Sequence, residues 1–459
     1  MMNKLTKRKQ LLLYGCSGIG VNLLNTIVGS YLCSALLTGG FVENVESWTY
    51  VNKDLVIAAV WAVMLVVAKI VDGVIDLPMS SFTDNLKTKW GKRRPAILIG
   101  WVPMIIAYLL FLLPLNGEAT VLNTVWFAVI LCVFYAFYTL TMVTFYATFA
   151  EVVDNESDRV FLSSVKSVCD VVYFCIGFAL IPLFVNLGTN IRIVALLFLP
   201  LACSMFIPLF LLKEQPTNDP EHQTEKVKPV NLFKSIAHCV KNKDFLIWML
   251  VHAIVFNLGM TLFLSGINEF FSTVGMPMTP IMACSFGPVP FTIILYNKVV
   301  KKKGVGFAYR YILVTFAFAM LLMASANYLP ESVRVFVGIA AALIASFSIG
   351  AFFSVGYTVP AHIAAESNEK TGIMTSSMIF AVQGLFEGVS AGVASGIVLT
   401  FIKSHDGAVT ETGSWFETVR LAGFIPVFVA FFCLLACILS WLVPKNITML
   451  GKGTEGKNE

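Results

Sequence analysis

The stretch LVIAAVWAVMLVVAKIVDGVIDLPM, from Leu55 to Met79, decides the fold of this chain. It is longer than the roughly 20 apolar residues that a helix needs to cross a bilayer, and it carries two acids, Asp72 and Asp76, one helical turn apart. A carboxylate within a membrane is costly unless it faces a bundle interior or an aqueous cavity, where it usually belongs to an ion or substrate pathway. The stretch therefore predicts a membrane-spanning helix with an internal ion site.

The composition of the whole chain also indicates a membrane protein. Of its 459 residues, 57% are hydrophobic and 13% are charged, whereas soluble globular chains have about 25% charged residues. Long apolar segments recur along the sequence, and each is a candidate span. Spans are expected at residues 11–38, 54–82, 96–116, 121–150, 162–187, 191–212, 244–270, 277–298, 307–328, 333–362, 373–402 and 418–443.

The positions of the basic residues predict how the spans are oriented. Lysine and arginine gather in alternate loops, at residues 4–9, 87–94, 226–243 and 298–310. Because such clusters mark cytoplasmic loops, we expect a multi-pass protein of the cell membrane with both termini in the cytoplasm. The alternation favours topology signals over nucleic-acid patches, so the expected partners are membrane lipid and a small-molecule substrate, with no nucleic acid, and the chain is expected to be a monomer.

The longest polar interruption runs from Lys213 to Asp244 and leaves six expected spans on each side. It predicts an N-terminal six-helix bundle at 1–212, a cytoplasmic linker at 213–243, and a C-terminal six-helix bundle with a cytoplasmic tail at 244–459. The fold class that follows is an all-α membrane protein with twelve transmembrane helices in two six-helix bundles, an architecture in which substrate and ion sites lie near the bilayer midplane.

Polar side chains, together with one methionine, lie on one face of several expected spans, at 3.6-residue spacing. The candidates are Asn22 and Asn25; Lys69, Asp72 and Asp76; Thr139, Met142 and Tyr146; Lys166 and Asp170; and Gln383 and Glu387. A water-accessible cavity between the bundles would accommodate all of these faces. Two carboxylates beside a hydroxyl offer the oxygen ligands that a hard cation prefers, and a pair of buried acids can also carry a proton, so Na⁺ and H⁺ both stay open.

The second span and the loop after it carry a recognisable order of residues: a lysine, two spaced aspartates and a proline (Lys69 to Pro78), then Thr83-Asp-Asn85 and Trp90-Gly-Lys-Arg-Arg-Pro95. This order resembles the signature of the glycoside-pentoside-hexuronide:cation symporter family of the major facilitator superfamily, which includes the melibiose carrier. The resemblance implies alternating access between two bundles and cation-driven symport of a sugar, glycoside or hexuronide.

The resemblance also implies roles for individual residues. Asp72 and Asp76, with Thr139, match the cation site of the family and would bind Na⁺ if the carrier is sodium-coupled; no other cofactor is expected. The lysine that usually completes this site on the eleventh helix is replaced by Gln383, which leaves Lys69 as the nearest counter-charge.

In the melibiose branch, the sugar site uses acids on the first and fourth helices and an aromatic residue on the fourth. This chain has Asn22, Met142 and Tyr146 at those places, and Lys166 in place of an arginine. Asn25 is a further candidate, and Asp170 and Glu387 are candidates without a clear counterpart in the family. The altered pocket implies a substrate other than melibiose, with Tyr146 stacking on a ring and the polar groups binding hydroxyls or a carboxylate.

Other interpretations stay open. Asp72 and Asp76 could form only a structural ion pair with Lys69, and Lys166 could be satisfied by Asp170. A carrier of a non-sugar solute, such as a lysolipid or another organic anion, or an uncoupled uniporter, would have the same fold. An enzyme is not expected, because the five histidines are scattered and form no His-Glu-x-x-His motif.

Overall fold

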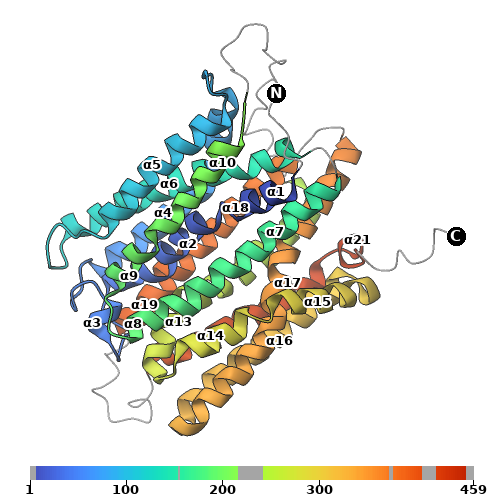
Figure 1. Ribbon diagram of the computed structural model, residues 1–459. Helices are drawn as coiled ribbons and strands as arrows, with labels where there is room; N and C mark the ends of the chain where they lie inside the picture. The colour runs from blue at the N-terminus through green and yellow to red at the C-terminus, as the bar shows by residue number, and fades with distance from the viewer. Residues whose placement is uncertain (1–6, 154–155, 215–240, 372–375, 406–419, 451–459) are drawn as a thin grey trace. The chain divides into compact units, whose positions relative to one another are not determined.

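The computed structural model describes residues 7–153, 156–214, 241–371, 376–405 and 420–450, and these residues are almost entirely helical (Figure 1). The α-helices before residue 214 are α1 (Arg8–Cys16), α2 (Ile19–Ile27), α3 (Val45–Trp48), α4 (Ala58–Asn85), α5 (Arg93–Phe111), α6 (Val121–Val152), α7 (Glu156–Cys175), α8 (Ile181–Asn186), α9 (Ile191–Phe198) and α10 (Phe206–Leu211). Those after residue 240 are α12 (Lys243–Trp248), α13 (Asn257–Val274), α14 (Met278–Phe286), α15 (Val289–Lys303), α16 (Val305–Ser325), α17 (Glu331–Thr371), α18 (Ser376–Gly392), α19 (Leu399–His405), α20 (Ile425–Leu439) and α21 (Lys445–Thr448).

Short π-helical and 3₁₀ segments join several of these helices into longer spans. The π-helical segments are η1 (Val28–Leu32), η3 (Ile176–Leu180), η6 (Met249–Phe256) and η8 (Val393–Val398). The 3₁₀ segments are η2 (Ser34–Leu36), η4 (Leu199–Met205), η7 (Ala326–Tyr328), η11 (Leu421–Phe424) and η12 (Ser440–Leu442).

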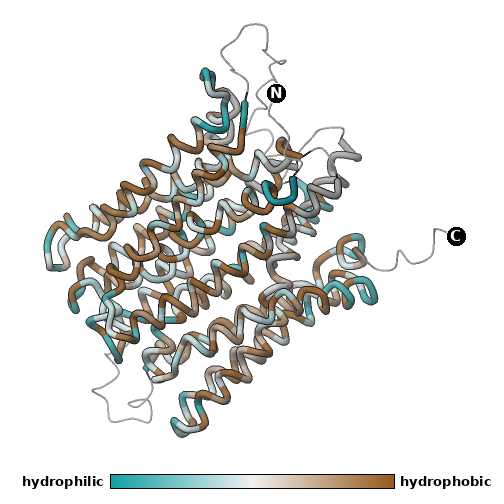
Figure 2. Tube along the Cα trace, viewed as in Figure 1, coloured by the Kyte–Doolittle hydropathy of each residue, from teal (hydrophilic) through white to brown (hydrophobic). Residues whose placement is uncertain are grey.

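Twelve of the resulting helices are long and apolar enough to cross a membrane. They lie at Arg8–Leu36, Ala58–Ile75, Arg93–Phe111, Val121–Thr148, Val168–Asn186, Ile191–Leu211, Lys243–Val274, Met278–Lys303, Val305–Tyr328, Glu331–Phe352, Val382–His405 and Leu421–Leu442. Hydrophobic residues occupy most of the length of these helices, while hydrophilic residues gather toward their ends (Figure 2). The expectation of twelve spans is therefore confirmed.

Capping side chains fix several helix ends at the positions where the polarity of the sequence changes. Thr120 precedes α6, and its hydroxyl accepts a hydrogen bond from the backbone N–H of Asn123. Asn190 and Asn242 cap α9 and α12 in the same way. Each cap satisfies a backbone donor that the first turn of a helix leaves without an intrahelical partner.

The chain forms two compact units. Unit 1 comprises Met1–Leu37 and Glu46–Pro229, and unit 2 comprises Thr38–Val45 and Val230–Glu459. The segment Thr38–Val45 packs on α13, where Ser272 Oγ accepts hydrogen bonds from the backbone N–H groups of Val42 and Glu43 at 2.9 and 3.2 Å. The expected linker at 213–243 lies mostly outside the described residues, so the expected domain boundaries stay a prediction.

Close helix contacts build each unit. In unit 1, α6 lies between α4 and α5 (Figure 1). In the same unit, α2 packs on η4. A Cβ added at Gly20 of α2 would lie 1.9 Å from the carbonyl oxygen of Leu201 in η4. In unit 2, α16 packs against α17 and α20. Small residues allow this approach, which matters in a bilayer because lipid tails are as apolar as the side chains and only packing and hydrogen bonds favour association.

Candidate functional site

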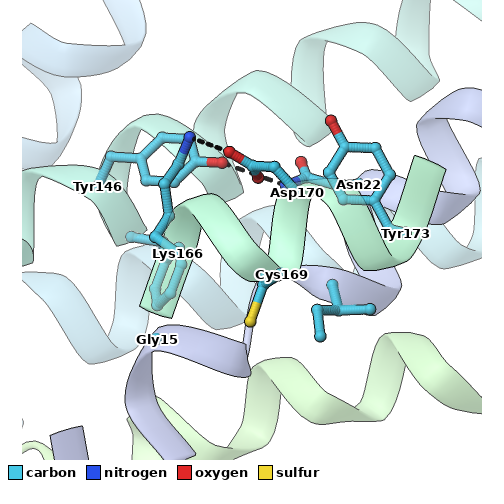
Figure 3. Close-up of a pocket in the computed structure, with 10 residues that line it drawn as sticks. Gly15, Asn22, Tyr146, Lys166, Cys169, Asp170 and Tyr173 are labelled. Atoms are coloured by element: carbon cyan, nitrogen blue, oxygen red, sulfur yellow. Dashed lines mark hydrogen bonds and ion pairs between the residues drawn. The ribbon is translucent and has the colours of Figure 1, made fainter. Parts of the chain in front are cut away.

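A pocket in unit 1 brings together four of the residues proposed from the sequence. It is formed by α1, α2, α6 and α7 (Figure 3). Its lining residues are Gly15, Gly18, Ile19, Asn22, Phe145, Tyr146, Lys166, Cys169, Asp170 and Tyr173. These side chains leave almost no room for a water-sized molecule between them, whereas typical ligand pockets have volumes of about 300–1,000 Å³. The pocket in this structure is therefore too small to hold a substrate.

The polar groups of this pocket are connected to one another. Lys166 Nζ lies 2.6 Å from Asp170 Oδ2 and 5.1 Å from the centre of the Tyr146 ring. The amide of Asn22 donates to the hydroxyl of Tyr146 at 3.2 Å, and its carbonyl accepts from Tyr138 at 3.0 Å. The side chains of Lys166, Asp170 and Tyr146 converge in Figure 3. The pocket thus offers a cation, an anion, an amide and an aromatic face within one unit.

Met142 and Asn25, two other proposed substrate residues, are not among the lining residues of this pocket. Met142 is buried, and a Cβ added at Gly18 would meet its terminal methyl group at 3.4 Å, so Met142 packs against the junction of α1 and α2. Asn25 is half-buried, and its side-chain carbonyl oxygen is buried without a hydrogen-bond partner among the described residues. That oxygen is a candidate for binding water or a ligand.

The proposed cation residues form a second group in unit 1. Lys69 Nζ lies 3.5 Å from Asp72 Oδ2 and 3.9 Å from the centre of the Tyr135 ring. Thr139 donates to Asp72 Oδ1 at 3.3 Å. The side chain of Asp76 lies outside what the structure describes. Asp72 thus already has a counter-charge and a hydroxyl, and a cation bound here would replace or share the contact with Lys69.

Gln383 and Glu387 lie in unit 2, one turn apart on α18. Gln383 donates to Glu387 Oε1 at 2.7 Å and to the carbonyl oxygen of Gly356 at 3.1 Å. Asn257 donates to the backbone carbonyl of Glu387 at 2.9 Å and to the hydroxyl of Ser390 at 2.7 Å. These contacts hold α13 and α17 against α18, and the role of Gln383 and Glu387 in a shared substrate site stays a prediction.

Ser390 belongs to Gly388-Val-Ser-Ala-Gly392, which has the Gly-x-Ser-x-Gly spacing of a hydrolase nucleophile elbow. The structure places this serine inside α18, where its hydroxyl donates to the carbonyl oxygens of Ala253 and Glu387 at 2.7 and 3.0 Å. A nucleophile elbow requires an exposed strand-to-helix turn, so this serine is a helix-packing residue.

Sequence reasoning missed a buried ion pair in unit 2. Lys403 Nζ on α19 lies 2.8 Å from Glu269 Oε1 on α13, and the two side chains are 3% and 0% exposed. The ring of Phe41 covers the ammonium group, with its centre 4.2 Å away. The signal available in the sequence was an acid and a lysine, each placed next to the end of an expected span.

The loop motif between α4 and α5 has a structural role in unit 1. Glu214 Oε2 accepts a hydrogen bond from the backbone N–H of Arg93 at 2.9 Å, at the start of α5. Gly91, two residues before Arg93, has a φ of +86°, and a Cβ added to it would overlap the Glu214 carboxylate. An acid at a helix N-terminus is favourable because it satisfies a free N–H group and interacts with the helix dipole.

The fold and the family match define the class of this protein, the major facilitator transporters. Residues 13–446 match the family described as MFS/sugar transport protein, and the chain belongs to this family. The membership places it among membrane transporters and not among enzymes. It also confirms the resemblance to a sugar:cation symporter family within the major facilitator superfamily.

One curated relative has a sequence similarity that covers part of the chain. It is a lactose permease of Lactobacillus helveticus, 27% identical over 165 residues. The match spans 35% of this chain and 25% of the permease, so most of the permease has no aligned counterpart here.

Solved structures of low sequence identity share the fold. The nucleoside transporter NupG is 13% identical with a TM-score of 0.58, covering 95% of this chain and 99% of its own. A D-xylose-proton symporter is 13% identical with a TM-score of 0.59, covering 96% and 98%. A structure titled for substrate recognition in proton-dependent oligopeptide transporters is 10% identical with a TM-score of 0.61, covering 95% and 98%. The expected fold class is thereby confirmed.

Proposed function

We propose that the protein is a secondary active transporter that carries a sugar, glycoside or hexuronide together with Na⁺ or H⁺ by alternating access. The observation that carries this proposal is the pocket in unit 1, where Tyr146 offers a flat face next to Lys166, Asp170 and Asn22. Sugars present apolar ring faces and many hydroxyls, and sites with an aromatic surface and a few fixed polar groups suit such ligands. The family of sugar transport proteins and the partial similarity to a lactose permease support the same substrate class.

The charged groups of the pocket extend the proposal to substrates with a carboxylate. Lys166 lies 2.6 Å from Asp170, and both side chains are partly exposed. A hexuronide carboxylate could exchange with Asp170 as the partner of the lysine, whereas a neutral glycoside would donate its hydroxyls to Asp170. Both outcomes keep the ligand on the same two side chains.

Coupling to a cation is assigned to Asp72 and Asp76, assisted by Thr139, with Lys69 as the counter-charge and Gln383 in place of a second lysine. A carboxylate and a hydroxyl suit Na⁺, and a carboxylate can also accept a proton. Binding of either ion weakens the attraction between Asp72 and Lys69, now 3.5 Å apart. Ion and substrate then share a coupling free energy, which must act equally in both directions. We place the carrier in the cell membrane with cytoplasmic termini.

Proteoliposomes containing the full chain test the proposal. Labelled glycosides, pentosides and hexuronates are offered with an imposed Na⁺ gradient, a proton gradient or neither, and a lysophospholipid and a non-sugar organic anion are included as rival substrates. The expected result is accumulation of at least one sugar-class substrate above its equilibrium level under one gradient. Equilibration without either gradient would identify a uniporter, and transport of only the rival substrates would refute the sugar assignment.

The coupling residues are tested by Asp72→Asn and Asp76→Asn, with Asp54→Asn as the matched control. Asp54 lies in an exposed loop before α4, so its replacement removes the same charge outside the span. We expect both span variants to lose accumulation while the control keeps it. Full accumulation by both Asp72→Asn and Asp76→Asn would refute the coupling role.

A further inference from the structure

Two cysteines meet next to the pocket. The sulfur of Cys16, at the end of α1, lies 3.2 Å from the sulfur of Cys169 on α7, and both are free thiols. A disulfide has an S–S bond of about 2.05 Å, so the sulfurs need to approach by only about 1.2 Å to form one. The described residues therefore contain two thiols, one on each of two helices, that are already placed for disulfide formation.

The helices that carry these cysteines pack closely beside Cys16. Gly15 precedes Cys16, and a Cβ added to it would lie 2.6 Å from Val165 Cγ1 and 3.4 Å from Leu162 Cδ1. Val165 is one turn before Cys169 on α7. The glycine allows the two backbones to approach, which is the condition that a disulfide places on its two Cα atoms.

One of the two cysteines, Cys169, also forms part of the pocket wall. Cys169 is 6% exposed and is a lining residue, and Gly15, next to Cys16, is another (Figure 3). Cys169 lies between Lys166 and Asp170 on α7. A disulfide at Cys169 would therefore act on the helical turn that presents the charged pair to the pocket.

We propose that Cys16 and Cys169 are a reversible oxidation site on the pocket wall, at which a two-electron thiol oxidant closes a disulfide between α1 and α7. With an azodicarboxamide such as diamide, the two thiols lose two electrons and two protons, the S–S bond forms, and the N=N bond is reduced to a hydrazine. A dithiol reductant restores both thiols. Cytoplasmic reductants hold thiols reduced, so the resting form is the dithiol and the disulfide is the form under oxidative stress.

Peptide mapping of the wild-type chain tests the linkage without any substrate. Membranes are treated with diamide, free thiols are blocked with iodoacetamide, and the digested chain is searched by mass spectrometry for a peptide containing both cysteines. The expected result is a Cys16–Cys169 peptide that disappears after dithiothreitol. Absence of this peptide while other thiols of the chain are oxidised, or linkage of either cysteine to Cys175 instead, would overturn the proposal.

Variants separate this site from the other cysteines. Cys16→Ser and Cys169→Ser should each abolish the linked peptide, and Cys175→Ser, on the same helix as Cys169, should leave it unchanged. Cys16→Ala and Cys169→Ala replace the serine variants if those do not fold. Persistence of a disulfide at Cys169 in a chain that lacks Cys16 would contradict the pairing.

The effect on the pocket rests on the proposed function and has its own measurement. With a substrate found in the proteoliposome panel, diamide should lower uptake several-fold in wild type and in Cys175→Ser, dithiothreitol should restore it, and Cys16→Ser should resist the inhibition. Formation of the linked peptide without a change in uptake would overturn the action on the pocket. Because mapping needs no substrate, failure of the sugar assignment leaves the linkage result intact.

Discussion

At the residue scale, the contact between Lys166 and Asp170 is expected to contribute less to the stability of the fold than to substrate binding. The two side chains are about a quarter exposed, and exposed pairs contribute only about 0–1 kcal/mol to stability. In the proposed substrate site their contribution to binding is larger, because hydrogen bonds to charged groups contribute about 1.5–3 kcal/mol. Lys166→Met should therefore raise the KM for uptake by about ten- to a hundredfold and shift the Tm little.

Uptake kinetics and thermal unfolding in detergent check this prediction. Lys298→Met, which removes an exposed lysine of α15, serves as the control and should change neither quantity. A Lys166→Met chain with an unchanged KM would mean that Lys166 is held only by its ion pair with Asp170.

Tyr146 presents two groups to the pocket, a hydroxyl and an aromatic ring, that substitutions can separate. Its hydroxyl accepts a hydrogen bond from Asn22 at 3.2 Å, and its ring faces the pocket. Tyr146→Phe removes only the hydrogen bond, with a cost of about 1 kcal/mol, and should keep most of the uptake. Tyr146→Leu also removes the aromatic face and should raise KM further, as a substrate titration of both variants would reveal. Equal KM values for the two variants would argue against stacking.

At the element scale, the approach of α2 to η4 depends on one glycine. A Cβ at Gly20 would lie 1.9 Å from a backbone oxygen of Leu201, which cannot move without shifting the helix. Although alanine favours helices by about 1 kcal/mol over glycine, overpacking costs about 1–3 kcal/mol. Gly20→Ala should therefore lower the Tm measured in detergent.

Gly117 provides the matched control for this substitution, because nothing lies within 4 Å of a Cβ added there. Gly117→Ala should leave the Tm within experimental error. A Gly20→Ala chain as stable as Gly117→Ala would show that α2 and η4 can separate freely.

The ion pair of Glu269 and Lys403 connects α13 to α19 in unit 2, and both side chains are almost completely buried. Removing one partner leaves an uncompensated buried charge, with a cost of about 3–5 kcal/mol. Lys403→Met should therefore lower the Tm strongly, and adding Glu269→Gln should recover part of the loss. Glu331→Gln, an exposed acid at the start of α17, is the control. A double variant less stable than Lys403→Met would refute the pairing argument.

The sequence predicted the elements better than the contacts between them. Runs of apolar residues located the spans, because a helix in lipid must be about 20 residues long whatever its neighbours are. The contact between Lys166 and Asp170 was also predictable, since four residues along one helix fix their distance. Lys403 and Glu269 were missed because their pairing depends on how α19 packs on α13, which no local pattern specifies.

At the scale of the whole molecule, both units contain π-helical segments in corresponding spans. Spans one and five of unit 1 contain the π-helical segments η1 and η3, and spans seven and eleven of unit 2 contain η6 and η8. Counted from the start of each unit, these are the same two spans. The repetition was not visible in the sequence, and it agrees with the internal repeats of transporter folds. π-helical turns often occur at functional sites, which directs attention to these four spans.

The topology of twelve spans can be tested with two exposed residues of unit 1 that lie on successive loops. Lys89 belongs to the basic loop between α4 and α5, and Gly117 to the loop between α5 and α6. Since lysine and arginine clusters stay in the cytoplasm and α5 crosses the membrane once, the two loops should face opposite sides. A membrane-impermeant maleimide applied to intact cells should label Gly117→Cys, whereas Lys89→Cys should react only after permeabilisation. The unsubstituted chain measures labelling of the native cysteines, and labelling of Lys89→Cys from outside would reverse the orientation and place both termini outside the cell.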